Sequence, residues 1–331
     1  MYRRRISTIA RRSLFWAALV LATAVGAAGD EARYLRVGTG PPGENHFSLG
    51  SLIASAISAP PGLPCNHNGG CGVAGLIAVA SATAGSEANL ETLAEGRLDA
   101  ALVEADTPLP PGRKSDSVRA IANLSLDQMQ LVVLKDGPIH SLRDLKGKHV
   151  SLGEEGSGTH LHAHQLLAAM GLKNNDIRED NLRSALAADA MLAGKLDAFF
   201  VMDEAPVPTI AELAKIKPIR LIGITGPAVE KMRKDDLLLE PSRISAGTYT
   251  GIEADVPTIA VNLTLVVSGK LSDDLVYGIT KSLWQPETQQ MLNEARRGGM
   301  PITAAGAITG LGVTLHPGAQ RFYNETKPVL R

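Results

Sequence analysis

Short apolar runs alternate with segments whose apolar residues recur at helical spacing through most of the chain. The run at 34–40 (YLRVGTG) predicts a strand that enters glycines, and 46–58 (HFSLGSLIASAIS) predicts the helix that follows it. The same order returns at 148–172, where Gly171 is placed to stop the helix. This alternation is typical of an α/β fold.

A second pair of segments repeats as well. Residues 93–106 (LAEGRLDAALVEAD) and 192–204 (LAGKLDAFFVMDE) share Leu-Ala, a glycine, a basic residue, Leu-Asp-Ala and an apolar run. Each predicts a helix that ends at the glycine, Gly96 or Gly194, followed by a buried strand. Acidic residues follow or end both strands: Glu104 and Asp106 in one copy, Asp203 and Glu204 in the other. Asp106 is also a candidate cap for the next loop, and Asp203 and Glu204 are also candidates for solvated rim charges.

Two similar α/β halves predict a two-lobed molecule with a ligand cleft and a hinge, because ligands gather beyond the carboxyl ends of strands in open α/β sheets. We expect lobe I at 29–125 and 262–331 and lobe II at 126–261. The hinge crossovers are expected near 125–128, at a strand break, and near 250–261. From Leu271 to about Arg297 the chain reads as helical, and a looser end with a turn at Pro317 follows.

The amino terminus predicts a secretory signal peptide at 1–28. Five arginines precede an apolar run from about Leu14 to Val25, and small residues follow it. An uncleaved anchor is the alternative, and Arg11 and Arg12 also fit twin-arginine export. No later stretch is long and apolar enough to be a transmembrane helix, so we expect an exported, periplasmic protein.

Charge argues against nucleic acid as a partner. The chain has 331 residues and a formal net charge of -1, and removal of the five leader arginines lowers Lys+Arg from 33 to 28 against 34 Asp+Glu, which gives -6. The roughly 300 remaining residues suffice for two domains.

The two cysteines, Cys65 and Cys71, lie in a segment rich in asparagine and glycine. In an oxidising compartment this spacing predicts a local disulfide that closes a small loop. A metal site that uses both thiols and His67 lacks an evident fourth ligand. Two free thiols are the expectation for a cytoplasmic protein.

Three histidines alternate in GEEGSGTHLHAHQLL (153–167). Ser157 or Thr159 can cap a helix in which His160 and His164 lie one turn apart on the same face, while His162 points elsewhere. A zinc site at His160 and His164 lacks the glutamate of HExxH, so we expect no metal and no cofactor here.

Three loops offer backbone N–H groups and hydroxyls to an anion: GTGPPGENH (38–46), TAGSEANL (83–90) and the Gly-Ser-Gly-Thr segment at 156–159. A helix N-terminus holds a carboxylate without an arginine. The alternative is that these residues only cap helices. The chain lacks a GxGxxG fingerprint, a P-loop and a GxSxG elbow at these places, which argues against nucleotide binding and serine hydrolysis.

As a set, these segments resemble the TAXI group of TRAP-transporter substrate-binding proteins. The resemblance runs in order through VGTGPPGENHFSLG, SATAGSEANLETLAEGRLDAALVEAD, DLKGKHVSLGEEGSGTHLHA, LAGKLDAFFV, AGTYTGIEADVPTIAV and LHPGAQRFYNE. It implies a periplasmic-binding-protein type II-like fold and a monomeric receptor that performs no chemistry. Such a receptor captures a small organic anion or amino acid, such as glutamate or a dicarboxylate, and delivers it to TRAP membrane permease subunits.

Carried over by motif, the resemblance implies a ligand set from both lobes: Gly38, Thr39, Gly40, Asn45, Thr83, Gly85, Ser86, Ser157, Gly158, Thr159, Thr248 and Tyr249. We add His46, Glu104 and Glu204. His46-Phe47 stands where such receptors often have two tyrosines, and Glu104 stands where glutamine is usual. A charged Glu104 in the cleft repels a carboxylate and favours an ammonium group, which points to an amino acid.

Two other functions stay open from the residues alone. The same receptor can serve as a ligand-binding sensor partner of a membrane histidine kinase, and a permease gene beside it would favour transport. An exported hydrolase or metalloenzyme that uses His160 and His164 would require turnover or bound zinc.

Overall fold

The computed structural model describes residues 32–62, 72–173, 175–296 and 303–326, which belong to one unit of the chain. The predicted signal peptide and Cys65–Cys71 disulfide lie outside these residues. Its strands are β1 (Arg33–Gly38), β2 (Ser58–Ala59), β3 (Val73–Ala74), β4 (Leu76–Ser81), β5 (Ala100–Glu104), β6 (Val118–Leu134), β7 (His149–Ser151), β8 (Arg178–Asp180), β9 (Ala198–Asp203), β10 (Ile219–Ile222), β11 (Glu240–Ile244) and β12 (Val256–Ser268).

Helices fall where the apolar periodicity places them in most of the chain. They are α1 (Asn45–Ile57), α2 (Ser86–Ala94), α3 (Gly158–Ala169), α4 (Ser184–Leu192), α5 (Pro208–Ile216), α6 (Pro227–Asp235), α7 (Asp273–Leu283), α8 (Pro286–Ala295) and α9 (Pro317–Thr326), with short 3-10 turns at η1 (Leu142–Leu145) and η2 (Gly306–Ile308). Gly96, Gly171 and Gly194 follow α2, α3 and α4 with positive φ angles of 76°, 76° and 70°, as expected of helix stops. The α/β prediction is confirmed.

Among the described residues, ten strands form one mixed sheet in the order β4-β1-β5-β12-β6-β9-β7-β8, with β10 paired to β6 and β11 to β12. In the first half β1 lies parallel between β4 and β5, and in the second half β7 lies parallel between β8 and β9. Antiparallel β12 and β6 join the two halves. The repeated sequence segments thus occupy corresponding places: β1 corresponds to β7, and β5 to β9.

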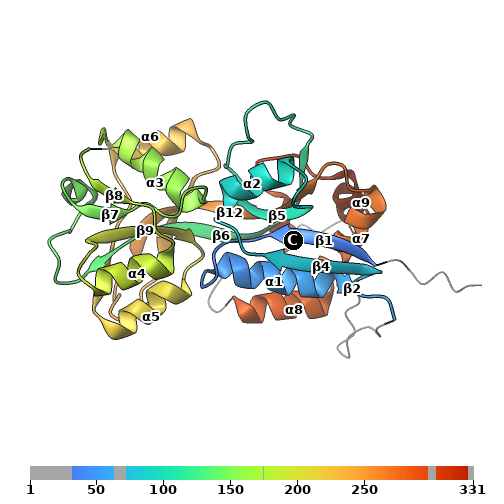
Figure 1. Ribbon diagram of the computed structural model, residues 1–331, viewed down its shortest axis with the longest axis horizontal. Coiled ribbons are helices and arrows are strands. Elements are labelled where there is room, and N and C mark those ends of the chain that lie inside the picture. The colour runs from blue at the N-terminus through green and yellow to red at the C-terminus, as the bar shows by residue number, and fades with distance from the viewer. Residues whose placement is uncertain (1–31, 63–71, 174, 297–302, 327–331) are drawn as a thin grey trace, which may run out of the picture. The chain divides into compact units, whose positions relative to one another are not determined.

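The buried core divides along the same line. The apolar cluster of the first half includes Leu124 of β6 and Leu263 of β12, whereas a cluster of the second half includes Met129 and Val261 of the same strands. Figure 1 shows α3 and α6 over one face of the second half and α4 and α5 over the other, and separate clusters pack beneath them. The molecule therefore has two α/β halves on a continuous sheet. The exact domain bounds stay a prediction.

Two sequence expectations were wrong. Strand β6 runs unbroken through 125–128, and its register with β12 shifts at two places, between Leu263 and Thr264 and between Leu265 and Val266. The helical segment expected from Leu271 to about Arg297 is confirmed, and Pro286 at the start of α8 divides it into α7 and α8. The expected turn at Pro317 is the start of α9, since proline fits the first position of a helix.

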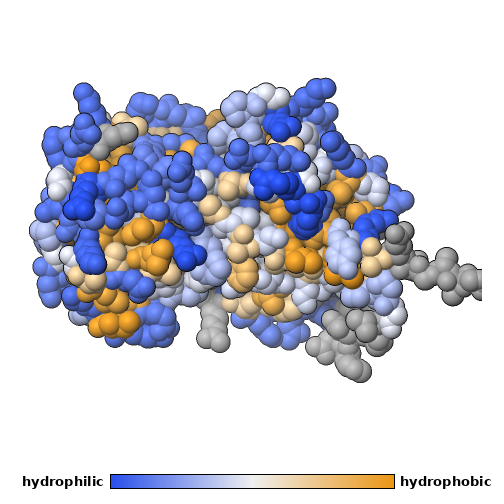
Figure 2. Space-filling model, viewed as in Figure 1, coloured by the Kyte–Doolittle hydropathy of each residue, from blue (hydrophilic) through white to orange (hydrophobic). Residues whose placement is uncertain are grey.

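The surface of the described residues is mostly polar. On the face drawn in Figure 2, hydrophilic residues surround smaller groups of apolar ones. Large apolar side chains such as Ile216 and Leu237 are exposed singly, which is ordinary for a folded protein. None of the helices in this part of the chain is both long and apolar enough to cross a membrane.

Candidate functional site

The loops that follow the parallel strands meet at the junction of the two halves. The backbone N–H of Ala88, in α2, donates to the carbonyl oxygen of Gly156, before α3, over 3.0 Å. A Cβ atom added to Gly85 would lie 3.0 Å from Cα of Ser157. The first-half and second-half glycine loops are therefore in direct contact, as their positions at strand ends predict.

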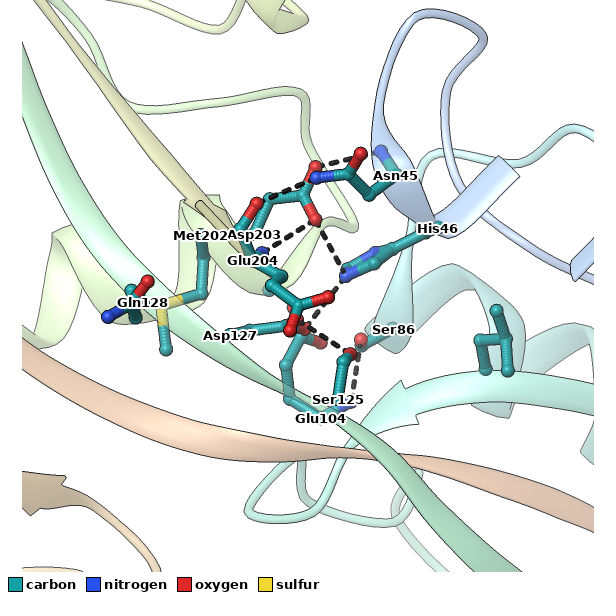
Figure 3. A network of polar contacts seen from close by, with 12 residues as sticks. Asn45, His46, Ser86, Glu104, Ser125, Asp127, Gln128, Met202, Asp203 and Glu204 are labelled. Atoms are coloured by element: carbon teal, nitrogen blue, oxygen red, sulfur yellow. Dashed lines mark hydrogen bonds and ion pairs between the residues drawn. The ribbon is translucent and has the colours of Figure 1, made fainter. Parts of the chain in front are cut away.

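A buried ion-pair network lies beneath these loops. His46 Nε2 is 2.7 Å from Asp127 Oδ2 and 3.6 Å from Asp203 Oδ1, and all three residues are at most 5% exposed. Figure 3 shows the imidazole of His46 pointing from α1 toward both carboxylates. Because α1 belongs to the first half, β9 to the second and β6 to both, this network ties the halves together.

Asn45 reinforces that link from the first position of α1. Its backbone N–H donates to Asp203 Oδ2 over 2.9 Å, and its side-chain amide donates to the carbonyl oxygens of Glu204 (2.7 Å) and Pro206 (3.2 Å). The backbone N–H of Glu204 donates to the other oxygen of Asp203 over 2.8 Å. Both oxygens of Asp203 are thus held by backbone N–H groups.

Glu104, at the end of β5, is buried against the start of α3. Its backbone N–H donates to the hydroxyl of Ser86 over 3.0 Å, and a Cβ atom added to Gly158 would lie 2.2 Å from Glu104 Oε1. Glu104 is 2% exposed, and its Oε2 has no hydrogen-bond partner among the described residues. A buried carboxylate oxygen without a partner is costly unless something else pairs with it.

His162 makes a second buried ion pair across the junction. Its Nε2 lies 2.7 Å from Asp106 Oδ2 in the first half, and its Nδ1 lies 2.7 Å from the carbonyl oxygen of Gly158. Both ring nitrogens face acceptors, so both carry protons and the ring is an imidazolium. Asp106 is therefore not a loop cap.

Four of these buried groups at the junction have raised pKa values. Burial raises the pKa of Glu104 to about 7 and that of Asp203 to about 8, against the opposing charge of His46. Burial by itself would lower the pKa of His162, but Asp106 raises it to about 9. The carboxylates of Asp127 and Asp203 likewise outweigh burial at His46 and raise its pKa well above its usual value.

We predict that the protein loses stability as the pH rises from 7 to 9. The native state holds a proton on Asp203 up to about pH 8 and on His162 up to about pH 9, whereas the unfolded chain has largely released both above pH 7. Each such proton lowers the free energy of unfolding by about 1.4 kcal/mol per pH unit, and Glu104, whose pKa is about 7, contributes only below that pH. Differential scanning calorimetry across this range should show a falling melting temperature. The slope above pH 7 should be shallower in His162→Gln, and a rising or flat wild-type profile would contradict the prediction.

The other predicted ligand residues of the first half serve packing and capping in this arrangement. The Thr39 hydroxyl donates to the carbonyl oxygen of Ser81 over 2.8 Å, and Gly38 and Gly40 lie against Asn89 and His46. The Thr83 hydroxyl is buried and has no partner among the described residues. Of this group, Thr83 alone presents an unused polar atom.

In the second half, Ser157 caps α3 by accepting from the N–H of His160 over 3.1 Å, as predicted, and the Thr159 hydroxyl accepts from the N–H of Met202 over 2.9 Å. Tyr249 is 2% exposed and its hydroxyl donates to Gln130 Oε1 over 2.6 Å, so it is a core residue here.

A pocket of about 340 Å³ opens beside the network, within the size range of small-molecule sites. Its walls include Asn45, Glu204, Thr248 and Arg296. Arg296 Nε donates to Glu204 Oε2 over 2.7 Å, while Arg296 Nη1 is buried without a partner among the described residues. Glu204 is 8% exposed and Asp203 fully buried, so neither is a solvated rim charge.

Sequence reasoning missed Asp127 and Arg296. Asp127 is the only acidic residue of β6 (VRAIANLSLDQMQLVVL). An acid inside a buried strand is unusual, and this was the signal that the sequence offered. Arg296 follows α8 without any local signal. His46, Asp127 and Asp203 also offer three metal-ligand atoms within 4.8 Å of one another, but hydrogen bonds already engage both oxygens of Asp203.

A family model for the NMT1-like family matches residues 37–326. The chain belongs to the NMT1-like family. The match begins within β1 and includes both halves and the junction.

Several solved structures are similar to this NMT1-like protein. An alkanesulfonate-binding protein of Xanthomonas axonopodis pv. citri, bound to MOPS, shares 16% identity over 89% of this chain and 84% of that chain, with a TM-score of 0.46. A putative L-cystine ABC transporter protein of Listeria monocytogenes shares 15% identity over 85% and 100%, with a TM-score of 0.48. A histidine kinase sensor domain with similarity to periplasmic binding proteins shares 17% over 82% and 99%, with a TM-score of 0.44. What each of them binds is a property of that protein.

Proposed function

We propose that this protein is a periplasmic solute receptor that captures an amino acid between its two halves and delivers it to a TRAP-type membrane permease. The observation that carries the proposal is the buried acidic junction, above all Glu104, whose Oε2 lacks a partner among the described residues. A ligand ammonium group placed there would neutralise a carboxylate that burial otherwise protonates. The TAXI resemblance supports the transport role, and the predicted signal peptide at 1–28 supports export.

The pocket beside Arg296 supplies the complementary charge. Asn45 donates to the carbonyl oxygen of Glu204 and lines this pocket, and its backbone binds Asp203, so the pocket adjoins the acidic network. Arg296 Nη1 has no partner within the described ranges and could donate to a ligand carboxylate while Nε holds Glu204. An amino acid carries both groups that this arrangement would pair.

Binding requires the halves to separate and close again. The loops of Gly85 and Ser157 are in contact, and the buried ion pair of His46 and Asp127 also joins the two halves. We propose a hinge on β6 and β12, where their buried residues change from the first-half cluster to the second-half cluster, and lobe II at 126–261 stays a prediction. A ligand that bridges both halves would stabilise the closed form by its higher affinity for that form.

The test compares ligands that differ by one group. We expect L-glutamate, or another amino acid of a full panel, to raise the melting temperature by mass action, and we expect glutarate to give little shift because it lacks the ammonium group. Mass spectrometry identifies any solute carried through purification, and calorimetry measures its affinity for the protein. An equal shift with glutarate would contradict ammonium recognition, and no shift with any amino acid would contradict the amino-acid assignment.

A further inference from the structure

Three metal-ligating atoms converge on the surface of the second half. His160 and His164 lie one turn apart on α3, and their Nε2 atoms are 3.1 Å apart. Oε1 of Glu179, from the neighbouring strand β8, is 3.1 Å from Nε2 of His164 and 3.9 Å from Nε2 of His160. The two histidines that the sequence places one turn apart are thus joined by a carboxylate from another segment of the chain.

We propose that His160, His164 and Glu179 form a binding site for a divalent transition-metal ion of the zinc class. Around a tetrahedral zinc ion with bonds of about 2.1 Å, ligand atoms lie about 3.4 Å apart, and the three observed separations bracket that value. Two imidazoles and a carboxylate are ligands that zinc accepts, and they suit calcium or magnesium poorly.

The surroundings of the site favour a cation. The three side chains are between 19% and 36% exposed, which leaves a fourth coordination position open to water. Glu87 and Glu155 both act electrostatically on His160 as nearby negative charges.

A neighbouring amide orients the carboxylate ligand. The Asn181 side-chain nitrogen, in the orientation that satisfies its neighbours, donates to Glu179 Oε1 over 3.0 Å. Such an outer partner fixes the position of a metal-binding carboxylate. His162, which alternates with the other two histidines, faces the buried side and pairs with Asp106, so it takes no part. A bound ion would link the first turns of α3, which begin at the junction, to β8.

The experiment uses the full chain with Cys65→Ser and Cys71→Ser, so that thiols do not bind the probe. Zn²⁺ is titrated by calorimetry, and Co²⁺ by its visible absorption, which reports tetrahedral coordination. We expect one ion per chain, and a loss of affinity on the order of 100-fold or more in His164→Gln and in Glu179→Gln, because each removes one of three protein ligands.

His140→Gln is the matched control, since His140 is an exposed histidine beside Arg220 and Asp144. It should bind both ions as the parent does. Both ligand variants replace partly exposed side chains, and their unfolding curves check that the fold is kept. Absence of binding in the parent chain, or unchanged binding in both ligand variants, would overturn the proposal. Amino-acid binding is scored separately on the same proteins without metal.

Discussion

Gly158→Ala should lower the free energy of unfolding by about 1–3 kcal/mol, the usual cost of overpacking a buried site, and should abolish the thermal shift produced by whichever amino acid binds. The added methyl group would lie 2.2–2.4 Å from Oε1, Cδ and Oε2 of Glu104. Because Glu104 is 2% exposed, its carboxylate has little room to turn aside, and we expect the halves to move apart to relieve the contact. Urea unfolding and differential scanning fluorimetry measure the two effects.

Gly223→Ala is the control for this prediction. A Cβ atom there would make only an ordinary 3.4 Å contact with Pro257, and we expect a change within about 0.5 kcal/mol. Combining Gly158→Ala with Glu104→Ala should recover much of the lost stability, since the obstructing carboxylate is gone. If Gly158→Ala unfolded like Gly223→Ala and kept its ligand shift, the close approach at the junction would be irrelevant to binding.

Local patterns of the sequence predict the elements of this fold well. Leu49, Ile53 and Ile57 recur at helical spacing and form the buried side of α1, and the apolar runs of β5 and β9 are fully buried strands. The repeated segments occupy corresponding places because each contains its own strand, turn and helix signals. An error occurs where proline fits both a turn and the start of a helix, as at Pro317.

The candidate site is less visible in the sequence, because its contacts join residues that are far apart in the chain. His46 and Asp127 are 81 positions apart, and His162 and Asp106 are 56 apart. The sheet order brings them together, and no short motif records it. Sequence reasoning placed Glu104 and Asp203 at strand ends, but their burial depends on the closure of one half against the other.

The sequence did not reveal the proposed metal site for the same reason, since Glu179 lies outside the helix that carries His160 and His164. The sequence showed His160 and His164 on one face of a helix and lacked the local glutamate that a zinc motif would supply. Glu179 comes from β8, which pairs with β7 through the register Val150↔Glu179. A ligand that arrives through sheet pairing carries no signal in the spacing of the helix.

Replacing one partner of the buried pair between His162 and Asp106 should have a larger effect than replacing both. His162→Leu leaves the Asp106 carboxylate, which is 1% exposed, without its cation, and the loss of one member of a buried pair costs about 3–5 kcal/mol. The double variant with Asp106→Leu removes both charges and buries apolar groups of similar size. We expect it to recover most of that loss, because the desolvation cost disappears with the charges.

The pair between His162 and Asp106 also crosses the junction, because Asp106 follows β5 of the first half and His162 lies on α3 of the second. An unpaired Asp106 regains water most easily if the halves separate, so His162→Leu should enlarge the radius of gyration in X-ray scattering, and the double variant should restore it. His140→Leu, at an exposed position, should change stability by about 0.5 kcal/mol or less. Additive losses in the double variant, with no change in scattering, would mean that the pair neither pays a desolvation cost nor holds the halves together.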